Sequence, residues 1–144
     1  MIGRTDTLKG SYEKLFSTDG KVRMSVQAHG ALTALTPYKV ICNEYGPITA
    51  AIASDTDYYF IGVPEEAQDS GAIFEIQIGG PIDDVVTPSL GVSVGHGFKI
   101  TSGAIADSTA DFSGDPGEFA VSRETSVTST TQAMYLVPEI IVGA

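Results

Sequence analysis

The chain has 144 residues, a length typical of one domain with a single hydrophobic core. Its net charge of −10 argues against nucleic-acid binding, because neutralising phosphates needs a basic surface. No segment approaches the roughly 20 apolar residues that span a bilayer, and the N-terminus lacks the apolar stretch of a signal peptide. We therefore expect a soluble chain that stays in the cytoplasm where it is made, with no membrane or nucleic-acid partner.

The first 23 residues differ from the rest in charge. They hold five basic and three acidic side chains (+2), whereas the remainder holds three basic and fifteen acidic ones (−12). No helical or strand period is sustained there, and Gly3, Gly10 and Gly20 interrupt the segment. We interpret residues 1–23 as an arm that precedes a single β domain at 24–144; a solvated tail is the alternative. The candidate partner-binding residues are Arg4, Lys9, Tyr12, Lys14, Leu15, Phe16, Lys21 and Arg23.

Strand patterns begin directly after the arm. Apolar and polar side chains alternate from Lys21 to Ala28, which predicts a strand with one buried face. Pro64–Gln68 has proline at a plausible first helical position and acids in the first turn, so one short helical turn is predicted there. Further strands are predicted at residues 38–42, 48–53 and 57–63.

The second half predicts more short strands. Ala72–Ile78 alternates cleanly, and Gly79-Gly80-Pro81 is expected to end that strand. Thr101–Gly117 is dominated by Ser, Thr, Asp and Gly and is interpreted as a long surface loop. Pro138 interrupts the last strand and favours a sheet edge. The remaining predicted strands cover residues 82–86, 90–94, 98–100, 118–122 and 134–142.

These patterns define the fold class. Short strands, frequent turn signals and sixteen glycines favour a mainly β fold over a parallel sheet crossed by helices. We predict a small β-barrel or β-sandwich with an extended N-terminal arm and at most one short helix.

One segment has the spacing of a serine hydrolase. Gly91-Val92-Ser93-Val94-Gly95 matches the G-x-S-x-G pattern, in which a strand-to-helix turn presents a nucleophilic serine. The residues that follow do not form a helical pattern, and no histidine follows Phe98. We therefore predict a glycine-bordered strand here and no enzymatic activity.

A second segment has the spacing of a calcium loop. Six residues occupy positions 1, 3, 5, 7, 9 and 12 of a twelve-residue window: Asp107, Thr109, Asp111, Ser113, Asp115 and Glu118. Phe112 stands where that loop needs glycine, so a solvated acidic loop is favoured. The loop and the tyrosines before Phe60 leave a non-catalytic calcium- or carbohydrate-binding β module as the alternative function.

Other reactive residues lack partners at useful spacings. His29 and His96 form no metal-binding motif, and the adjacent acids Asp83 and Asp84 point to opposite faces of a strand. Cys42 is the single cysteine, and its apolar neighbours predict a buried, unreactive thiol. We predict no catalytic residue, no metal site and no cofactor.

A resemblance rests on strand rhythm and glycine placement across residues 48–100. Its three segments are Tyr59-Phe60-Ile61-Gly62-Val63, Ser70–Gly80 and Val92-Ser93-Val94-Gly95-His96-Gly97. In this order they resemble the small capsid decoration (cement) proteins of tailed bacteriophages.

The resemblance implies a virion structural protein that binds the outside of the major capsid protein lattice and stabilises the head. It implies the major capsid protein as partner, a homo-oligomer with a trimer favoured, and a place on the capsid surface after synthesis in the host cytoplasm. An acidic β body with a basic arm agrees with that role.

Overall fold

The structure is a computed structural model that describes residues 19–53, 58–113, 117–138 and 141–142. These residues form ten strands: β1 (Val22–Gln27), β2 (Tyr38–Asn43), β3 (Gly46–Ala50), β4 (Tyr58–Gly62), β5 (Ile73–Val92), β6 (His96–Thr101), β7 (Ala104–Asp111), β8 (Glu118–Ser122), β9 (Ser126–Leu136) and β10 (Ile141–Val142). The predicted mainly β class is confirmed, and the described part of the chain contains no helix. Within it, accordingly, no helix of membrane-spanning length and hydropathy occurs.

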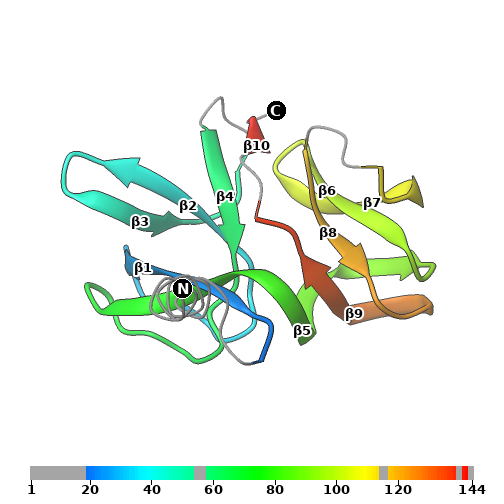
Figure 1. Cartoon of the computed structure of the whole chain (residues 1–144), viewed down its shortest axis with the longest axis horizontal. Coiled ribbons are helices and arrows are strands. Elements are labelled where there is room, and N and C mark those ends of the chain that lie inside the picture. The colour runs from blue at the N-terminus through cyan, green and yellow to red at the C-terminus, as the bar shows by residue number, and fades with distance from the viewer. Residues whose placement is uncertain (1–18, 54–57, 114–116, 139–140, 143–144) are drawn as a thin grey trace, which may run out of the picture.

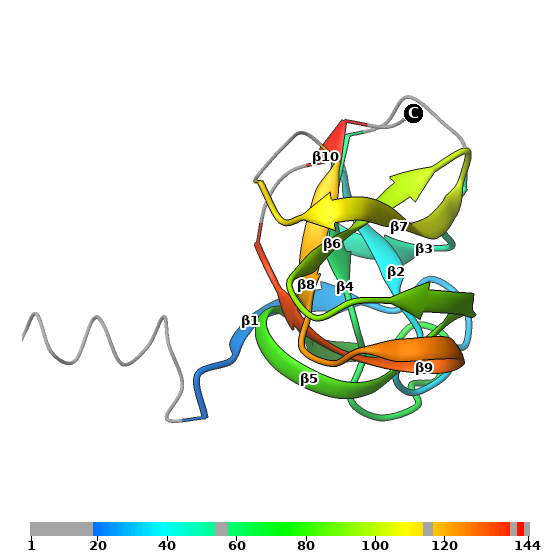
Figure 2. The same cartoon turned by 90° about the vertical axis from the view of Figure 1, so that its right-hand side faces the viewer.

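The strands form one open, mixed sheet in the order β10-β4-β2-β3-β1-β5-β9-β8-β6-β7. In Figure 1, β1 to β4 lie on the left, β6 to β9 lie on the right, and β5 crosses between them. Figure 2 shows how strongly β5 and β9 curve. Because the sheet curls, Tyr59 of β4 and Ile105 of β7 belong to one core although they lie near opposite ends of the strand order.

Two hydrophobic clusters hold the sheet together. The larger cluster joins β4, the second half of β5 and β6 to β9, and its buried members are Tyr59, Ile61, Val63, Ile82, Val85, Val92, Phe98, Ile100, Ile105, Phe119, Ala120, Met134 and Leu136. The smaller cluster lies under β1, β2 and the first half of β5, and its buried members are Val26, Val40, Ile76 and Ile78. The larger cluster therefore supports the right-hand half of Figure 1.

Strand β5 corrects the prediction that Gly79-Gly80-Pro81 ends a strand. The strand continues for 20 residues and changes partner at the glycines, from β1 up to Gly79 to β9 from Gly80 onward. Gly80 has φ +90°, and a side chain there would collide with the carbonyl oxygen of Gly20. The Gln77 side-chain amide donates to the carbonyl oxygens of Gly79 and Pro81 at 3.0 Å. The glycines therefore bend the strand, as strands do where they pass from one layer to another.

The predicted helical turn at Pro64–Gln68 is wrong. Gln68 instead forms an antiparallel bridge with Leu32, in which each backbone N–H donates to the other's carbonyl. The carbonyl of Pro64 accepts from the N–H of Leu35. These long-range bonds satisfy the backbone groups that a helix would pair locally.

The predicted surface loop at Thr101–Gly117 is also wrong over most of its length. Ala104–Asp111 forms β7, which pairs with β6 across a two-residue turn in which Ser102 and Gly103 both have positive φ. A strand at the edge of a sheet tolerates polar side chains because one of its edges remains solvated. Because β7 is rich in polar side chains, its composition resembles that of a loop.

The remaining boundaries agree more closely. The strands predicted at 21–28, 38–42, 48–53, 57–63 and 118–122 correspond to β1, β2, β3, β4 and β8. The last predicted strand is divided: β9 begins earlier, at Ser126, and β10 follows Pro138. β1 begins at Val22, so the last two residues of the segment assigned to the arm lie in the sheet.

Candidate partner-binding surface

Most of the candidate partner-binding residues lie outside the described part of the chain: Arg4, Lys9, Tyr12, Lys14, Leu15 and Phe16. Lys21 and Arg23 are described, and both face acids of the same chain. Arg23 Nε lies 2.9 Å from Glu65 Oε1, and Lys21 Nζ lies 3.9 Å from Glu65 Oε2. The structure therefore places these two cations at the start of β1, beside the Pro64–Gln68 segment.

Arg23 is held on two sides. Its Nη2 also lies 2.8 Å from Asp19 Oδ2, in the turn that leads into β1. The hydrogen bond to Asp19, followed by that to Glu65, raises the pKa of Arg23 above its usual range. Such partly exposed pairs typically contribute 0–1 kcal/mol of stability. Arg23 thus fixes the entry into the sheet and is less available to a partner than its sequence position suggests.

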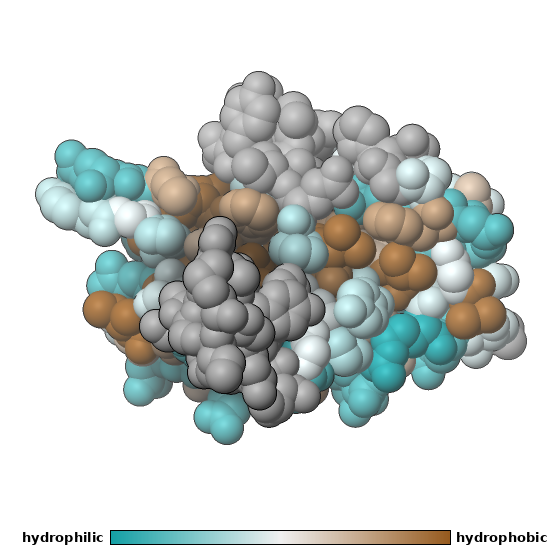
Figure 3. All heavy atoms as spheres, viewed as in Figure 1, coloured by the Kyte–Doolittle hydropathy of each residue, from teal (hydrophilic) through white to brown (hydrophobic). Residues whose placement is uncertain are grey.

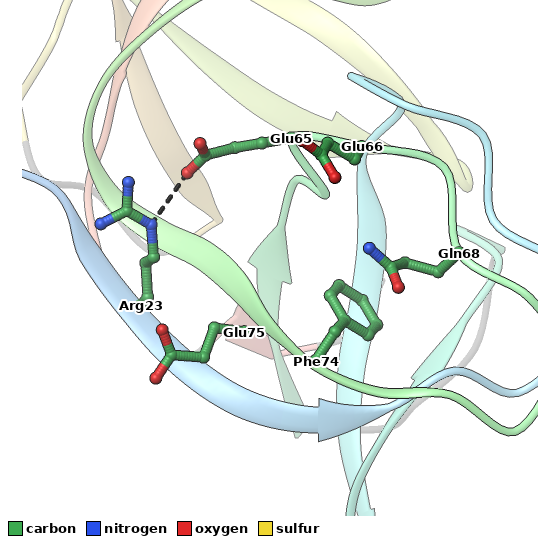
Figure 4. A pocket seen from close by; sticks show the side chains of 6 residues that line it. All are labelled: Arg23, Glu65, Glu66, Gln68, Phe74 and Glu75. Atoms are coloured by element: carbon green, nitrogen blue, oxygen red, sulfur yellow. Dashed lines mark hydrogen bonds and ion pairs between the residues drawn. The ribbon is translucent and has the colours of Figure 1, made fainter.

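An acidic hollow of about 250 Å³ adjoins this pair (Figure 4). Its wall combines carboxylates with one aromatic ring, and its lining residues are Arg23, Glu65, Glu66, Gln68, Phe74 and Glu75. Glu65 points toward Arg23, and Phe74 lies on the same side as Gln68. The hollow is open and shallow enough that water reaches its carboxylates, so it presents negative charge to the surroundings.

A second hollow, of about 170 Å³, lies between β1 and the β2–β3 hairpin, and we call it the β1–β3 hollow. Its lining residues are Ser25, Val26, Gln27, Tyr45, Pro47, Ile48 and Ile73. Tyr45 is 86% exposed and Ile73 is 76% exposed, the highest values among the large hydrophobic side chains described. Figure 3 shows hydrophobic atoms at the left end of the molecule, below the largely hydrophilic hairpin.

Sequence reasoning missed the β1–β3 hollow, although a signal was present. Ile73 lies two residues before Glu75, and alternate residues of a strand share a face. Ile73 is therefore on the polar, outward face of β5, opposite the buried Ile76. Tyr45 is in the turn between β2 and β3, where a large aromatic side chain has little core to enter. An apolar residue on the wrong face of an amphipathic strand was the available clue.

The G-x-S-x-G segment does not form a strand-to-helix turn. Ser93 is exposed, and a turn at Val94 and Gly95 leads directly into strand β6. His96 lies 3.2 Å through its Nδ1 from Asp107 Oδ1, and its backbone N–H donates to the Ser93 carbonyl. The predicted glycine-bordered strand is therefore correct only for Gly91 and Val92, which end β5, and Ser93 to Gly95 connect it to β6.

The window with the spacing of a calcium loop is divided between two strands. Asp107 and Asp111 belong to β7, whereas Glu118 begins β8 and is 5% exposed. Ser113 Oγ donates to Glu118 Oε1 at 2.9 Å, and Asp107 pairs with His96. Asp115 lies outside the described residues. Among the residues described, no three His, Cys, Asp or Glu side chains are grouped as metal ligands.

The structure also describes Asp83, Asp84 and His29, which the sequence analysis singled out. Asp83 pairs with Arg123 at 2.7 Å, and Asp84 follows it at an irregularity of β5 with φ +58°. His29 is exposed, and its backbone N–H donates to Thr49 Oγ1.

Tyr59 and Cys42 differ in burial. Tyr59 is 2% exposed and belongs to the larger cluster. Cys42 is exposed, so its predicted burial is wrong. β2 is buried at Val40 but continues past the core into the hairpin with β3, and Cys42 lies in that projecting part, opposite Pro47.

The chain was compared with known proteins. No protein-family model and no curated protein matches it. Among solved structures, it is similar to the N-terminal base of the head fiber protein gp8.5 of bacteriophage phi29, with a TM-score of 0.51 and 12% sequence identity. The match covers 83% of this chain and 96% of that chain. At this identity the comparison shows a shared fold, which extends over nearly the whole fiber base.

Proposed function

We propose that this chain is a virion structural protein of a bacteriophage that binds the outside of the major capsid protein lattice and stabilises the head. The observation that carries the proposal is the fold shared with the base of a phage head fiber. The resemblance of residues 48–100 to phage decoration proteins, inferred independently from sequence, favours the same particle. In this proposal the chain is made in the host cytoplasm and acts on the capsid surface as a homo-oligomer, for which a trimer is favoured.

The proposal assigns binding to the N-terminal segment. Residues 1–23 are basic and carry three neighbouring apolar anchors, Tyr12, Leu15 and Phe16, whereas the rest of the chain is strongly acidic. Complementary charge speeds encounter and fixes orientation, and buried aromatic side chains supply most of the affinity in many interfaces. The proposal gives the chain no catalytic step and no cofactor.

Co-sedimentation with undecorated capsids of the phage that encodes the chain tests this function. The full chain is expected to bind saturably and stoichiometrically. A variant lacking residues 1–18, which keeps Asp19 and the ion pairs at the start of β1, is expected to bind at least tenfold more weakly. A variant with Lys9→Glu and Lys14→Glu has its full length and tests the charge alone. Absence of saturable binding by the full chain would overturn the proposal.

A further inference from the structure

Strand β1 has a backbone edge that its neighbours leave largely open. On one side β1 pairs with β5 from Val22 to Gln27. On the other side it is in register with β3 at Gln27 and Ile48 alone among the described residues. β3 therefore diverges from β1, and the β1–β3 hollow occupies the space between them.

The hydrogen-bond pattern shows which backbone groups point to that side. Gln77 of β5 exchanges both backbone bonds with Val63, so it does not bond to Arg23, the residue opposite it on β1. Antiparallel pairs alternate, so two residues further along β1 the N–H and C=O of Ser25 also point away from β5. The described residues place no strand partner opposite Ser25 on that side, since the one register pair of β1 with β3 lies at Gln27 and Ile48, and Ser25 is exposed.

An open edge beside an apolar hollow is the arrangement that accepts an added strand. Unpaired N–H and C=O groups supply main-chain hydrogen bonds, and side-chain pockets beside them supply specificity. Here Ile73 and Tyr45 supply exposed apolar area. Glu44 precedes Tyr45 and Glu75 lies two residues after Ile73, so acidic side chains flank the apolar area. The surface therefore fits an extended segment that presents apolar and basic side chains on one face.

The chain itself contains such a segment. In an extended conformation Tyr12, Lys14 and Phe16 point to one face, because alternate residues of a strand share a side. We propose that residues 12–16 of a second copy dock into the β1–β3 hollow as a strand added to the open edge of β1. The inference deepens the proposed function, on which it rests, by assigning residues 12–16 to contacts between copies on the lattice, so that their removal weakens capsid binding through the loss of those contacts.

The route of the chain favours a second copy over the same one. Gly20, which leads into β1, packs against Gly80 of β5, where even a Cβ atom would collide with its carbonyl. β5 flanks β1 on the side opposite β3. The chain thus enters β1 from the β5 side, whereas the hollow lies on the β3 side. Exchange of a terminal segment between identical chains is an inexpensive way to form an oligomer.

The exposed Cys42 gives a test, because it lies opposite Pro47, which lines the hollow. Ser11→Cys and Ser17→Cys variants flank the proposed strand without changing it. Isotopically heavy and light copies are mixed under dilute conditions, concentrated without capsids, and oxidised. Mass spectrometry is expected to find disulfides from position 11 or 17 to Cys42 that join heavy to light chains. The same variants with Cys42→Ser control for links between two N-terminal segments.

Two outcomes would overturn the proposal. Disulfides that join only chains of the same isotope would show that each chain docks its own segment. Absence of a link to Cys42 in both variants would show that the hollow is not the docking site. Since no capsid is present, either result is separate from the co-sedimentation test, and capsid binding that persists without these links would leave the proposed function standing.

Substitutions test the two parts of the surface. Ser25→Pro removes an N–H that points away from β5, whereas Ser25→Ala retains it. Ser25→Pro is expected to weaken self-association about five- to tenfold and Ser25→Ala to leave it unchanged. Ile73→Asp is expected to weaken it more than tenfold, against no effect of Val94→Asp at another exposed apolar position. Sedimentation velocity measures association, and unchanged thermal unfolding shows that each variant folds. If the Ser25→Pro variant does not fold, the Ile73→Asp variant alone tests the proposal. Unchanged self-association of a folded Ile73→Asp variant would contradict the proposal.

Discussion

The two halves of β5 lie in different surroundings. The first half, up to Gly79, pairs with β1 over the smaller cluster and presents Ile73 to solvent. The second half pairs with β9 and contributes Ile82, Val85 and Val92 to the larger cluster. One continuous strand therefore joins a well-packed scaffold to a region with an open edge and exposed apolar side chains. The right-hand half of Figure 1 is therefore expected to supply most of the stability, and the proposed docking surface lies on the left-hand half.

The largest expected effect tests where the stability lies. Phe98 is fully buried and its ring lies 6.5 Å from that of Phe119, centroid to centroid, in the larger cluster. Phe98→Ala is expected to lower the free energy of unfolding by about 3–5 kcal/mol. Phe74→Ala, beside the smaller cluster and only partly buried, is expected to cost about 1–2 kcal/mol. Urea unfolding of both variants measures the two losses in unfolding free energy. Equal losses would contradict the expectation that the larger cluster supplies most of the stability.

The next effect tests the bend that joins the halves. Gly80 and Gly71 have similar positive φ values, +90° and +86°, but only Gly80 has backbone atoms of Gly20 and Lys21 within contact of an added Cβ. Gly80→Ala is expected to destabilise the chain by about 2–4 kcal/mol, and Gly71→Ala by about 1–2 kcal/mol from left-handed strain alone. Thermal unfolding compares them. A smaller loss at Gly80 than at Gly71 would show that the close approach of Gly20 is not required.

The smallest effect concerns Tyr59, where β4 from the left-hand half enters the larger cluster. Its hydroxyl is buried with no hydrogen-bond partner among the described residues, and burial raises its pKa. Tyr59→Phe is therefore expected to change stability by less than about 1 kcal/mol at neutral pH. Lys39 Nζ lies 5.4 Å from the ring centroid, a contact that phenylalanine retains.

The raised pKa also predicts a pH dependence. Because folded Tyr59 holds its proton more tightly than the unfolded chain does, its contribution is complete below pH about 10 and is lost as pH rises through the folded pKa. Stability measured from pH 8 to 11 should therefore fall less steeply for Tyr59→Phe than for the original chain. An equal fall in both would mean that Tyr59 ionises as readily in the folded chain as in the unfolded one.

The sequence predicted the parts of the fold that depend on local alternation. β1 was predicted because Val22 to Ala28 alternates in a way that only a half-buried strand explains. Gly79-Gly80-Pro81 was misread because its local chemistry is the same in a turn and in a bend; the distinction depends on Gly20 and Leu136, which are distant in sequence. β7 was missed because its stability comes from pairing with β6 and its own side chains are polar.

The candidate site was predicted less completely. The charge of the N-terminal segment was evident from the sequence, but the engagement of Arg23 by Glu65 depends on a contact 42 positions away. The β1–β3 hollow depends on how far β3 diverges from β1, which no local pattern encodes. A candidate surface formed where a neighbouring strand diverges is visible only once the order of strands is known.

A cryo-electron microscopy reconstruction of undecorated capsids incubated with the chain tests the central claim most directly. The account predicts additional density on the outer surface of the lattice, into which the ten-stranded sheet fits. It further predicts density joining neighbouring copies at the β1–β3 hollow. Capsids that remain bare at saturating concentrations, or density confined to the interior of the shell, would contradict it.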